Sequence, residues 1–255
     1  MAERMISQMR DAIAARVDAI CMIGQAGDDA IMGLAEEAKN AGIIMMYQNV
    51  NVPRVRQRYG GGYTGLVDLS IQGIGLANTA IAELGIRQGD RVVVFGAWDQ
   101  PGRYYREEGT ASTFEANGVI VERIITPEGS SSDTQILIPI ISAQLQSHPE
   151  TKMIVYSGGQ NLSMAGTYME ACGKKPGEVY NIGFDSSPAI LDGFEKGYIQ
   201  LTADQQPYLQ GFMPVMNAFL TKNFELGGLE IETGAGFINK ENYRAVEELV
   251  TKGYR

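Results

Sequence analysis

The feature that most constrains the fold is a regular alternation of short apolar runs with longer segments of helical periodicity. The apolar runs predict buried strands, and the longer segments predict amphipathic helices. Strands are predicted at 19–24, 42–49, 91–96, 119–125, 152–159, 179–185 and 198–205. Helices are predicted at 3–17, 28–40, 68–86, 136–146, 163–172, 187–196, 214–226 and 241–252, and a further helix follows the strand at 91–96 and ends near residue 117. This alternation is typical of repeated βαβ units, so we expect an α/β fold of doubly wound parallel sheets.

The length of 255 residues allows a large core and two lobes. The stretch YGGGYTG, Tyr59 to Gly65, is rich in glycine, so we expect a boundary between lobes there. Open parallel sheets bind ligands beyond the carboxyl ends of their strands. Polar residues that directly follow predicted strands are therefore the candidate ligand-binding residues.

Charge and composition exclude several classes of function. A net charge of -9 argues against a nucleic-acid surface and against docking on an anionic membrane. No apolar run approaches the roughly 20 residues that span a bilayer, and no signal peptide is visible, so we expect no membrane insertion. One histidine, His148, and two separated cysteines, Cys21 and Cys172, form no metal-ligand or catalytic cluster. We therefore predict no enzyme activity, no metal site and no cofactor.

The stretch QGIGLANTAIAELGI, residues 72–86, has the appearance of a dinucleotide-binding loop that runs into a helix. Such a loop needs a buried strand directly before its glycines, and GLVDLSIQ is not a long apolar run. The small and apolar residues from Gly73 to Leu84 instead share one face of a helix that begins near Asp68. We interpret Gly73 and Gly75 as helix residues that permit close packing.

Four stretches in order resemble one protein family. They are ARVDAICMIGQAGDDAIMGLAEEAKNAGIIMMYQN, REEGTASTFEANG, VYNIGFDSSPAILDGFEKGYIQLTADQQPYLQGF and TGAGFINKENY. Together they are similar to the ribose- and galactose-binding type of periplasmic sugar-binding proteins of bacterial ABC importers, along essentially the whole chain. The third stretch is the most specific of the four.

The resemblance implies a type I periplasmic binding fold, in which three crossing strands join two lobes. By resemblance the crossings fall near Gly62, Gln205 and Gly234. The N-terminal lobe is then expected at 1–62 with 206–233, and the C-terminal lobe at 63–205 with 234–255. The family opens with a strand, a helix and a second strand before the point that matches Glu3, so this lobe is expected to be incomplete. An exposed strand edge would then favour association.

By resemblance the chain is a solute-binding protein that captures a sugar or polyol between its lobes by hinge closure. Its partner would be the membrane permease of an ABC importer, and its location would be periplasmic or extracytoplasmic. The alternative is the effector-binding core of a lactose-repressor-type transcription regulator, which shares the fold. The identity of the ligand, the oligomeric state and the permease stay open.

Three candidate ligand-binding residues follow predicted strands and match the family's pattern. Asn49 stands where the family usually has Asp, and the alternative role is a strand-end turn residue. Asp185, in IGFD, matches the family's ligand Asp, and the alternative is a cap of the helix from Ser187 onward. Gln205 matches the hinge Gln ahead of Pro207.

Four further candidates are predicted at strand ends with a less certain register. Trp98 follows the strand RVVVFG, and we interpret it as a stacking platform for a sugar rather than as plain packing. Arg103 and Tyr104 lie near the family's ligand Arg, whereas Arg106 matches a position that is more often structural. Gln160 follows Gly158 and Gly159, which occupy the family's Asn-Asp register. Several amides and few acids indicate a neutral polyhydroxylated ligand.

Overall fold

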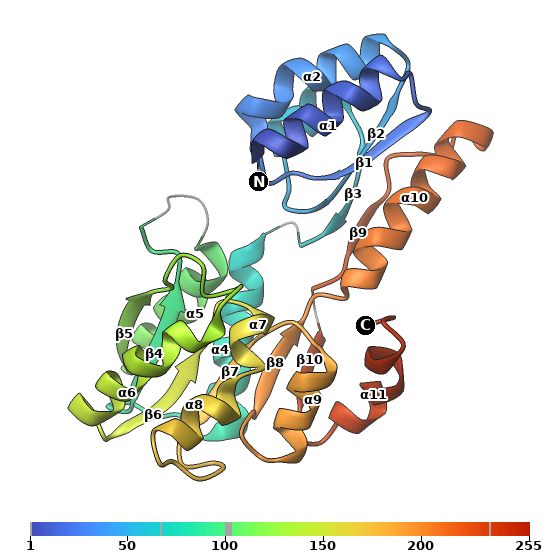
Figure 1. Cartoon of the computed structure of the whole chain (residues 1–255). Helices are drawn as coiled ribbons and strands as arrows, with labels where there is room; N and C mark the ends of the chain where they lie inside the picture. The colour runs from blue at the N-terminus through green and yellow to red at the C-terminus, as the bar shows by residue number, and fades with distance from the viewer. Residues whose placement is uncertain (1, 67, 100–103, 235) are drawn as a thin grey trace. The chain divides into compact units, whose positions relative to one another are not determined.

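The computed structural model describes residues 2–66, 68–99, 104–234 and 236–255. The chain divides into two compact units, and it passes between them three times. Unit 1 comprises residues 1–67 and 206–234, and unit 2 comprises residues 68–205 and 235–255. Each unit has its own sheet, so each can be followed separately in Figure 1.

Unit 1 is built on a four-stranded parallel sheet of order β1-β2-β3-β9. Its strands are β1 (Ala19–Ile23), β2 (Ile44–Asn49), β3 (Gly62–Gly65) and β9 (Glu230–Glu232). Its helices are α1 (Ala2–Ala14), α2 (Asp28–Asn40), α3 (Pro53–Tyr59) and α10 (Pro207–Phe224).

The two faces of this sheet are covered by different helices. Met45 and Tyr47 of β2 point into an apolar core with residues of α1 and α2, such as Met9 and Leu34. Between them, Met46 must point to the opposite face, because side chains alternate along a strand. On that face α10 contacts β1, β2 and β3.

Unit 2 is built on a six-stranded sheet of order β10-β8-β7-β6-β4-β5. All pairs are parallel except that of β10 with β8, which is antiparallel. The strands are β4 (Arg91–Gly96), β5 (Ile120–Ile125), β6 (Thr151–Val155), β7 (Tyr180–Phe184), β8 (Leu201–Asp204) and β10 (Gly236–Asn239).

Helices cover both faces of the second sheet, as a doubly wound fold requires. Val92 and Val94 of β4 pack against α4 (Leu69–Leu84) and α5 (Tyr105–Ala116). Val93 and Phe95 pack on the other face. The helices beyond α5 are η1 (Thr134–Ile136), α6 (Leu137–Ser147), α7 (Gly159–Leu162), α8 (Ala165–Ala171), α9 (Pro188–Glu195) and α11 (Tyr243–Thr251).

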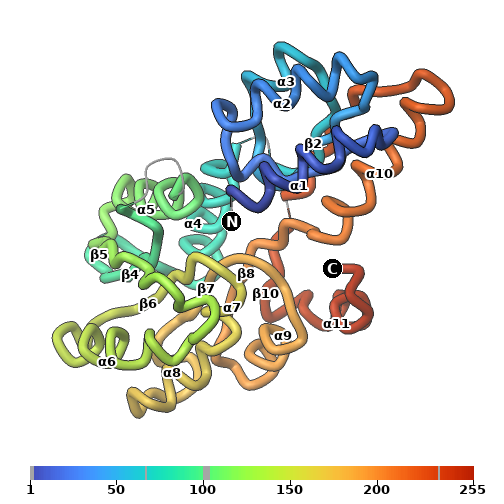
Figure 2. Tube along the Cα trace, turned by 45° about the horizontal axis from the view of Figure 1, so that its top comes forward, coloured from blue at the N-terminus to red at the C-terminus, as the bar shows by residue number. Residues whose placement is uncertain are grey.

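The glycine-rich stretch at 72–86 is a helix, as interpreted from the sequence. Asp68 caps α4 by accepting a hydrogen bond of 2.8 Å from the backbone N–H of Ser70. Helices α4 and α5 lie side by side in both views (Figures 1 and 2). A Cβ atom on Gly73 would stand 1.8 Å from the carbonyl oxygen of Arg106, so only glycine permits this approach.

Two boundaries differ from the sequence predictions. The helix predicted at 214–226 begins at Pro207, because this proline occupies the first helical turn, where its missing N–H is no loss. Residues 63–67 belong with unit 1, since β3 pairs with both β2 and β9. A further difference is an extra short helix: α8 corresponds to the helix predicted at 163–172, and α7 precedes it, beginning at the last residue of the strand predicted at 152–159.

We expect Gly73→Ala to destabilise unit 2 by about 3 kcal/mol, because α4 must move away from α5. Chemical denaturation followed by circular dichroism, which reports on the helices of both units, measures this loss. Gly33→Ala on α2 is the matched control. Nothing lies within 4 Å of a Cβ at Gly33, so its helix should gain about 0.5–1 kcal/mol. Equal stability of Gly73→Ala and the unsubstituted chain would contradict the packing argument.

Candidate functional site

The parallel strands of unit 2 bring several predicted site residues to one edge of the sheet. Asp185 directly follows β7, and Gln205 directly follows the neighbouring strand β8. Trp98 lies two residues beyond the end of β4, and Gln160 lies in α7 after β6. Arg103 lies outside the described residues. Asn49 belongs to unit 1.

The centre of this edge is the carboxylate of Asp185. Its Oδ1 accepts a hydrogen bond from Nε2 of Gln205, and its Oδ2 accepts one of 3.2 Å from the backbone N–H of Gly159. The hydroxyl of Thr202 donates to the Asp185 carbonyl oxygen at 2.6 Å. These contacts hold a half-buried acceptor in one orientation at the carboxyl end of the sheet.

The alternative role for Asp185 was a cap of α9, but another residue caps this helix. Ser187 is the N-cap, and its hydroxyl accepts a hydrogen bond of 3.2 Å from the N–H of Ile190. Asp185 instead binds the first residue of α7, where Gly159 approaches so closely that a Cβ would stand 2.9 Å from the Asp185 Cβ. Gly159, which occupies one of the two positions where the family has Asn-Asp, thus donates a backbone hydrogen bond to Asp185.

Gln160 is not part of the Asp185 cluster. Its side chain is exposed, and among the described residues it makes no hydrogen bond to Asp185. Its carbonyl oxygen accepts a bond of 2.7 Å from the Ser163 hydroxyl, which supports the first turn after β6. Its role as a ligand-binding residue stays a prediction.

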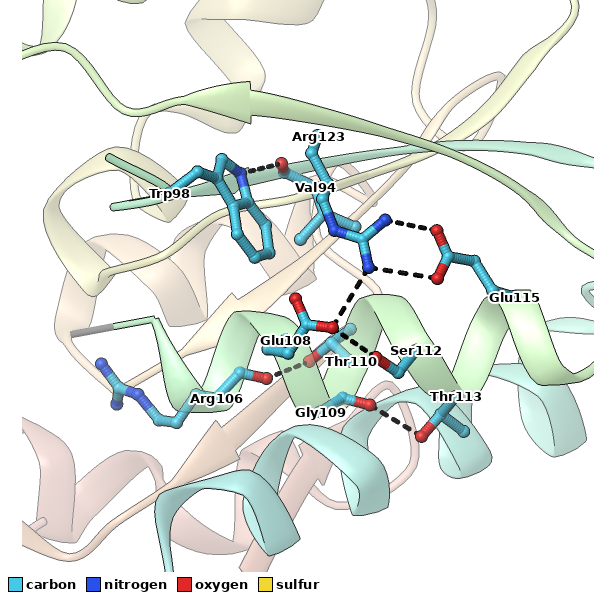
Figure 3. Close-up of polar contacts among 10 residues, drawn as sticks. All are labelled: Val94, Trp98, Arg106, Glu108, Gly109, Thr110, Ser112, Thr113, Glu115 and Arg123. Atoms are coloured by element: carbon cyan, nitrogen blue, oxygen red, sulfur yellow. Dashed lines mark hydrogen bonds and ion pairs between the residues drawn. The ribbon is translucent and has the colours of Figure 1, made fainter. Parts of the chain in front are cut away.

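Trp98 turns back onto its own strand, as Figure 3 shows. Its Nε1 donates to the carbonyl oxygen of Val94 at 3.2 Å. The guanidinium of Arg123 stands 5.4 Å from the Trp98 ring, and the Tyr104 ring lies 5.6 Å away and tilted. Arg123 also pairs with Glu108 and Glu115 on α5. The indole is therefore held by packing, and a role in sugar stacking stays a prediction.

Arg106 is a polar residue at this edge that the sequence analysis interpreted as structural. Its guanidinium carbon lies 4.5 Å from the centre of the Phe184 ring, and its Nη2 lies 3.5 Å from the carbonyl oxygen of Ser157. It thus lies beside the carboxyl ends of β6 and β7. The Ser157 hydroxyl is in turn 3.0 Å from that of Thr126, which follows β5.

At the carboxyl end of the sheet in unit 1, the side-chain amides of three residues are linked by hydrogen bonds through Thr233. We name this group, Asn49, Gln206 and Gln210 with Thr233, the amide relay. Nδ2 of Asn49 donates to Oε1 of Gln210 at 2.8 Å, and Nε2 of Gln210 donates to the hydroxyl of Thr233 at 3.0 Å. Nε2 of Gln206 donates to the Thr233 carbonyl oxygen at 3.0 Å. Sequence reasoning missed Gln210, although it lies in the most specific of the four resembling stretches, QQPYLQGF.

The backbone beside this relay is fixed by a buried tyrosine. The hydroxyl of Tyr63 lies 2.7 Å from the carbonyl oxygens of Asn49 and of Leu66. Burial raises the pKa of Tyr63 above its usual range, so the hydroxyl keeps its proton and remains a donor. Asn49 is the last residue of β2 and Asp185 directly follows β7, and both have positive φ, of 60° and 75°. Asn and Asp tolerate this conformation better than most residues do.

An open cavity of about 400 Å³ lies in unit 1 along β1, which is an edge strand of the described sheet. Part of its wall is apolar, from Met5, Met9, Ile20, Met22 and Ile23, and part is polar, from Arg4, Gln8, Gln25 and Gln48. Gln48 directly precedes Asn49, so the cavity reaches the end of β2 next to the amide relay.

Neither a metal centre nor a membrane span is found in the described part of the chain. No group of three or more His, Cys, Asp and Glu side chains there is arranged to hold a metal ion. No helix of that part is long and apolar enough to cross a bilayer.

Comparison with known proteins matches this chain to one family. The sequence model of a family described as periplasmic binding protein domain matches residues 1–223. The xylose/arabinose-binding protein of Sulfolobus acidocaldarius is 28% identical over 219 residues, which are 81% of this chain. The chain spans about half of that relative, since the match covers 53% of it.

Solved structures with the same fold include two sugar-binding transport proteins. A carbohydrate transporter protein of Acidothermus cellulolyticus in complex with myo-inositol has a TM-score of 0.80 at 20% identity, covering 100% of this chain and 85% of that one. A solute-binding protein of Burkholderia graminis in complex with D-arabinose has a TM-score of 0.78 at 21% identity, covering 95% and 82%. The predicted fold class is confirmed.

The positive φ of Asp185 leads to a stability test. We expect Asp185→Ala to be less stable than Asp185→Gly by about 1 kcal/mol, because both lose the same side-chain bonds and only glycine relieves the backbone. Asp192, within α9, is the matched control. There the order should reverse, since glycine is the poorer residue inside a helix by about 1 kcal/mol. The same order at both positions in denaturation experiments would refute strain at Asp185.

Proposed function

The chain belongs to the family of periplasmic binding protein domains, and we propose that it is the solute-binding component of an ABC importer that captures a neutral sugar or polyol. The resemblance seen in the sequence predicts this family, and that prediction is confirmed. The family is one of binding proteins, in agreement with the prediction that the chain is not an enzyme.

The observation that carries the proposal is the held carboxylate of Asp185 with Gln205 beside it. A sugar presents many hydroxyls that both donate and accept, so it is bound by fixed acceptors and by amides that can do either. The amide relay around Asn49 supplies the same chemistry in unit 1. We take an uncharged polyhydroxylated ligand because the carboxylate of Asp185 and the amides can pair with hydroxyls, and so can the Arg106 guanidinium at the same edge of the sheet.

The names of the relatives support the same class of ligand. The curated relative is a xylose/arabinose-binding protein, and solved structures of the same fold hold myo-inositol, D-arabinose or D-fucose. All of these are neutral and rich in hydroxyl groups. Pentoses are the first candidates, because the curated relative is named for two of them.

The permease partner and the location are also part of the proposal. The description of the family as periplasmic supports a location outside the cytoplasm, and the resemblance seen in the sequence implies membrane permease subunits that receive the ligand, so we propose both for this chain. Capture by closure of two lobes stays a prediction from the resemblance. The repressor-type alternative finds no support in the comparisons, and the net charge of -9 disfavours DNA.

The test is a thermal-unfolding and calorimetric screen of the full chain. The panel contains D-xylose, L-arabinose, D-ribose, D-galactose, D-fucose and myo-inositol, with D-glucuronate as the charged control. A ligand at a hundredfold excess over its Kd should add about 2.7 kcal/mol of stability, which raises Tm by several degrees. We expect a shift with neutral members and none with glucuronate. A shift with glucuronate alone, or with no member, would contradict the proposal.

Gln205→Ala tests the site itself. We expect an affinity about tenfold weaker, because Asp185 loses the donor that orients it and the ligand loses a polar partner. Gln88→Ala is the matched control, since Gln88 is exposed and lies before β4, at the opposite end of the strand from Trp98. Titration calorimetry should find that Gln88→Ala binds as the unsubstituted chain does. Equal losses in the two variants would place the ligand elsewhere.

A further inference from the structure

Two buried tyrosines lie side by side in the sheet of unit 1. Tyr47 of β2 and Tyr63 of β3 are partners in the parallel register, and both belong to the core that α1 and α2 cover. They are 0% and 1% exposed. Burial raises the pKa of Tyr47 to about 12 and the pKa of Tyr63 above its usual range, so both hydroxyls keep their protons. The two residues differ chiefly in what their hydroxyls contact.

The hydroxyl of Tyr63 lies between two backbone carbonyl groups. It is 2.7 Å from the carbonyl oxygen of Asn49 and 2.7 Å from that of Leu66. A Cβ atom on Gly65 would stand 2.6 Å from the hydroxyl oxygen, so this approach needs glycine. By contrast, the hydroxyl of Tyr47 is buried and has no hydrogen-bond partner among the described residues. One ring thus brings a donor to the carboxyl end of β2, and the other does not.

The ring of Tyr63 is held in place by Arg56 of α3. The guanidinium carbon of Arg56 lies 5.1 Å from the centre of the ring. Its Nη1 donates to Oδ1 of Asn51 at 3.0 Å, and its Nη2 pairs with Glu230, the first residue of β9. Contacts from several segments of unit 1 therefore limit the positions that the ring and its hydroxyl can take.

The carbonyl group that Tyr63 holds belongs to a residue in an unusual backbone conformation. Asn49 has a φ of 60°, and such a conformation persists where the surrounding contacts determine it. The side chain of Asn49 bonds to Gln210, and its carbonyl oxygen accepts from the Tyr63 hydroxyl. The amide relay thus acts on the side chain, whereas Tyr63 acts on the backbone from which the direction of that side chain follows.

We propose that Tyr63 is a positioning residue for ligand binding and that it acts through Asn49. This inference rests on the proposed function, because it takes Asn49 as a residue that contacts the sugar. The Tyr63 hydroxyl donates to the carbonyl oxygen of Asn49 and so holds the side-chain amide at the end of β2 in one direction. Tyr63 is itself buried in the core, so it affects a ligand only through its neighbours.

The first measurement needs no ligand. Tyr63→Phe and Tyr47→Phe each remove one buried neutral hydroxyl from the same core, so Tyr47→Phe is the matched control. In amide correlation NMR spectra of the unliganded full chain, the side-chain signals of Asn49 are identified by their loss in Asn49→Ala. We expect these signals to shift or broaden in Tyr63→Phe and to stay unchanged in Tyr47→Phe. Tm should fall in Tyr63→Phe, which loses a bonded donor, and stay equal or rise in Tyr47→Phe, which loses an unpaired hydroxyl.

The second measurement is affinity by titration calorimetry, with circular dichroism to show that each variant is folded. The probe is D-xylose, or the panel member with the largest shift in Tm if D-xylose does not bind. We expect Kd to rise about tenfold in Tyr63→Phe and to change by less than about twofold in Tyr47→Phe. In the Asn49→Ala background, Tyr63→Phe should also change Kd by less than about twofold, because a residue that acts through Asn49 then has nothing to position.

Two results would overturn the proposal. One is that the Asn49 side-chain signals are the same in Tyr63→Phe as in the unsubstituted chain. The other is a loss of affinity from Tyr63→Phe that keeps its full size in the Asn49→Ala background, because Tyr63 would then act through the fold as a whole. A chain that binds no member of the panel would contradict the proposed function, whereas the unliganded spectra would still decide whether Tyr63 holds Asn49.

Discussion

Parallel strand pairing is the constraint on which the rest of the molecule depends. It aligns the carboxyl ends of β4, β6, β7 and β8 at one edge and gives each sheet a single polar end. The strands themselves are buried on both faces, so they can carry little besides apolar residues. Polar chemistry is therefore confined to the residues just past the strands, which is where Asp185 and Gln205 meet.

The sequence predicted the strands that consist almost entirely of apolar residues. The runs at 91–96 and 179–185 are apolar because both faces of those strands are covered, and β4 and β7 form there. The apolar run at 19–24 also forms a strand, β1, although its residues are mostly half-buried. The short strands β3, β9 and β10 were missed as strands, because GYTG, EIE and GFIN contain no apolar run. The start of α10 was missed because its apolar residues face outward and its inner residues include amides.

The site was predictable only as far as it depends on strand order. Asp185 and Gln205 were found because each directly follows a strand, and their contact follows from the adjacency of β7 and β8. The contact of Asp185 with the backbone N–H of Gly159 was not predicted, because it depends on α7 beginning at Gly159, while the role of Gln160 stays a prediction. Arg106 and Gln210 reach their partners from helices by tertiary packing, which no local pattern reports.

The amide relay depends on the rotation of α10 about its own axis. Gln210 must face the sheet to accept from Asn49 and donate to Thr233, and Asn217 must do so to reach the carbonyl oxygen of Leu229. A helix that turns amides inward has fewer inward positions for large apolar residues. The aromatic residues Tyr208, Phe212 and Phe219 of α10 lie on its outward side, where they are 40–54% exposed. The hydrogen bonds that orient Asn49 thus also determine which side chains α10 turns toward the sheet and which it turns away from it.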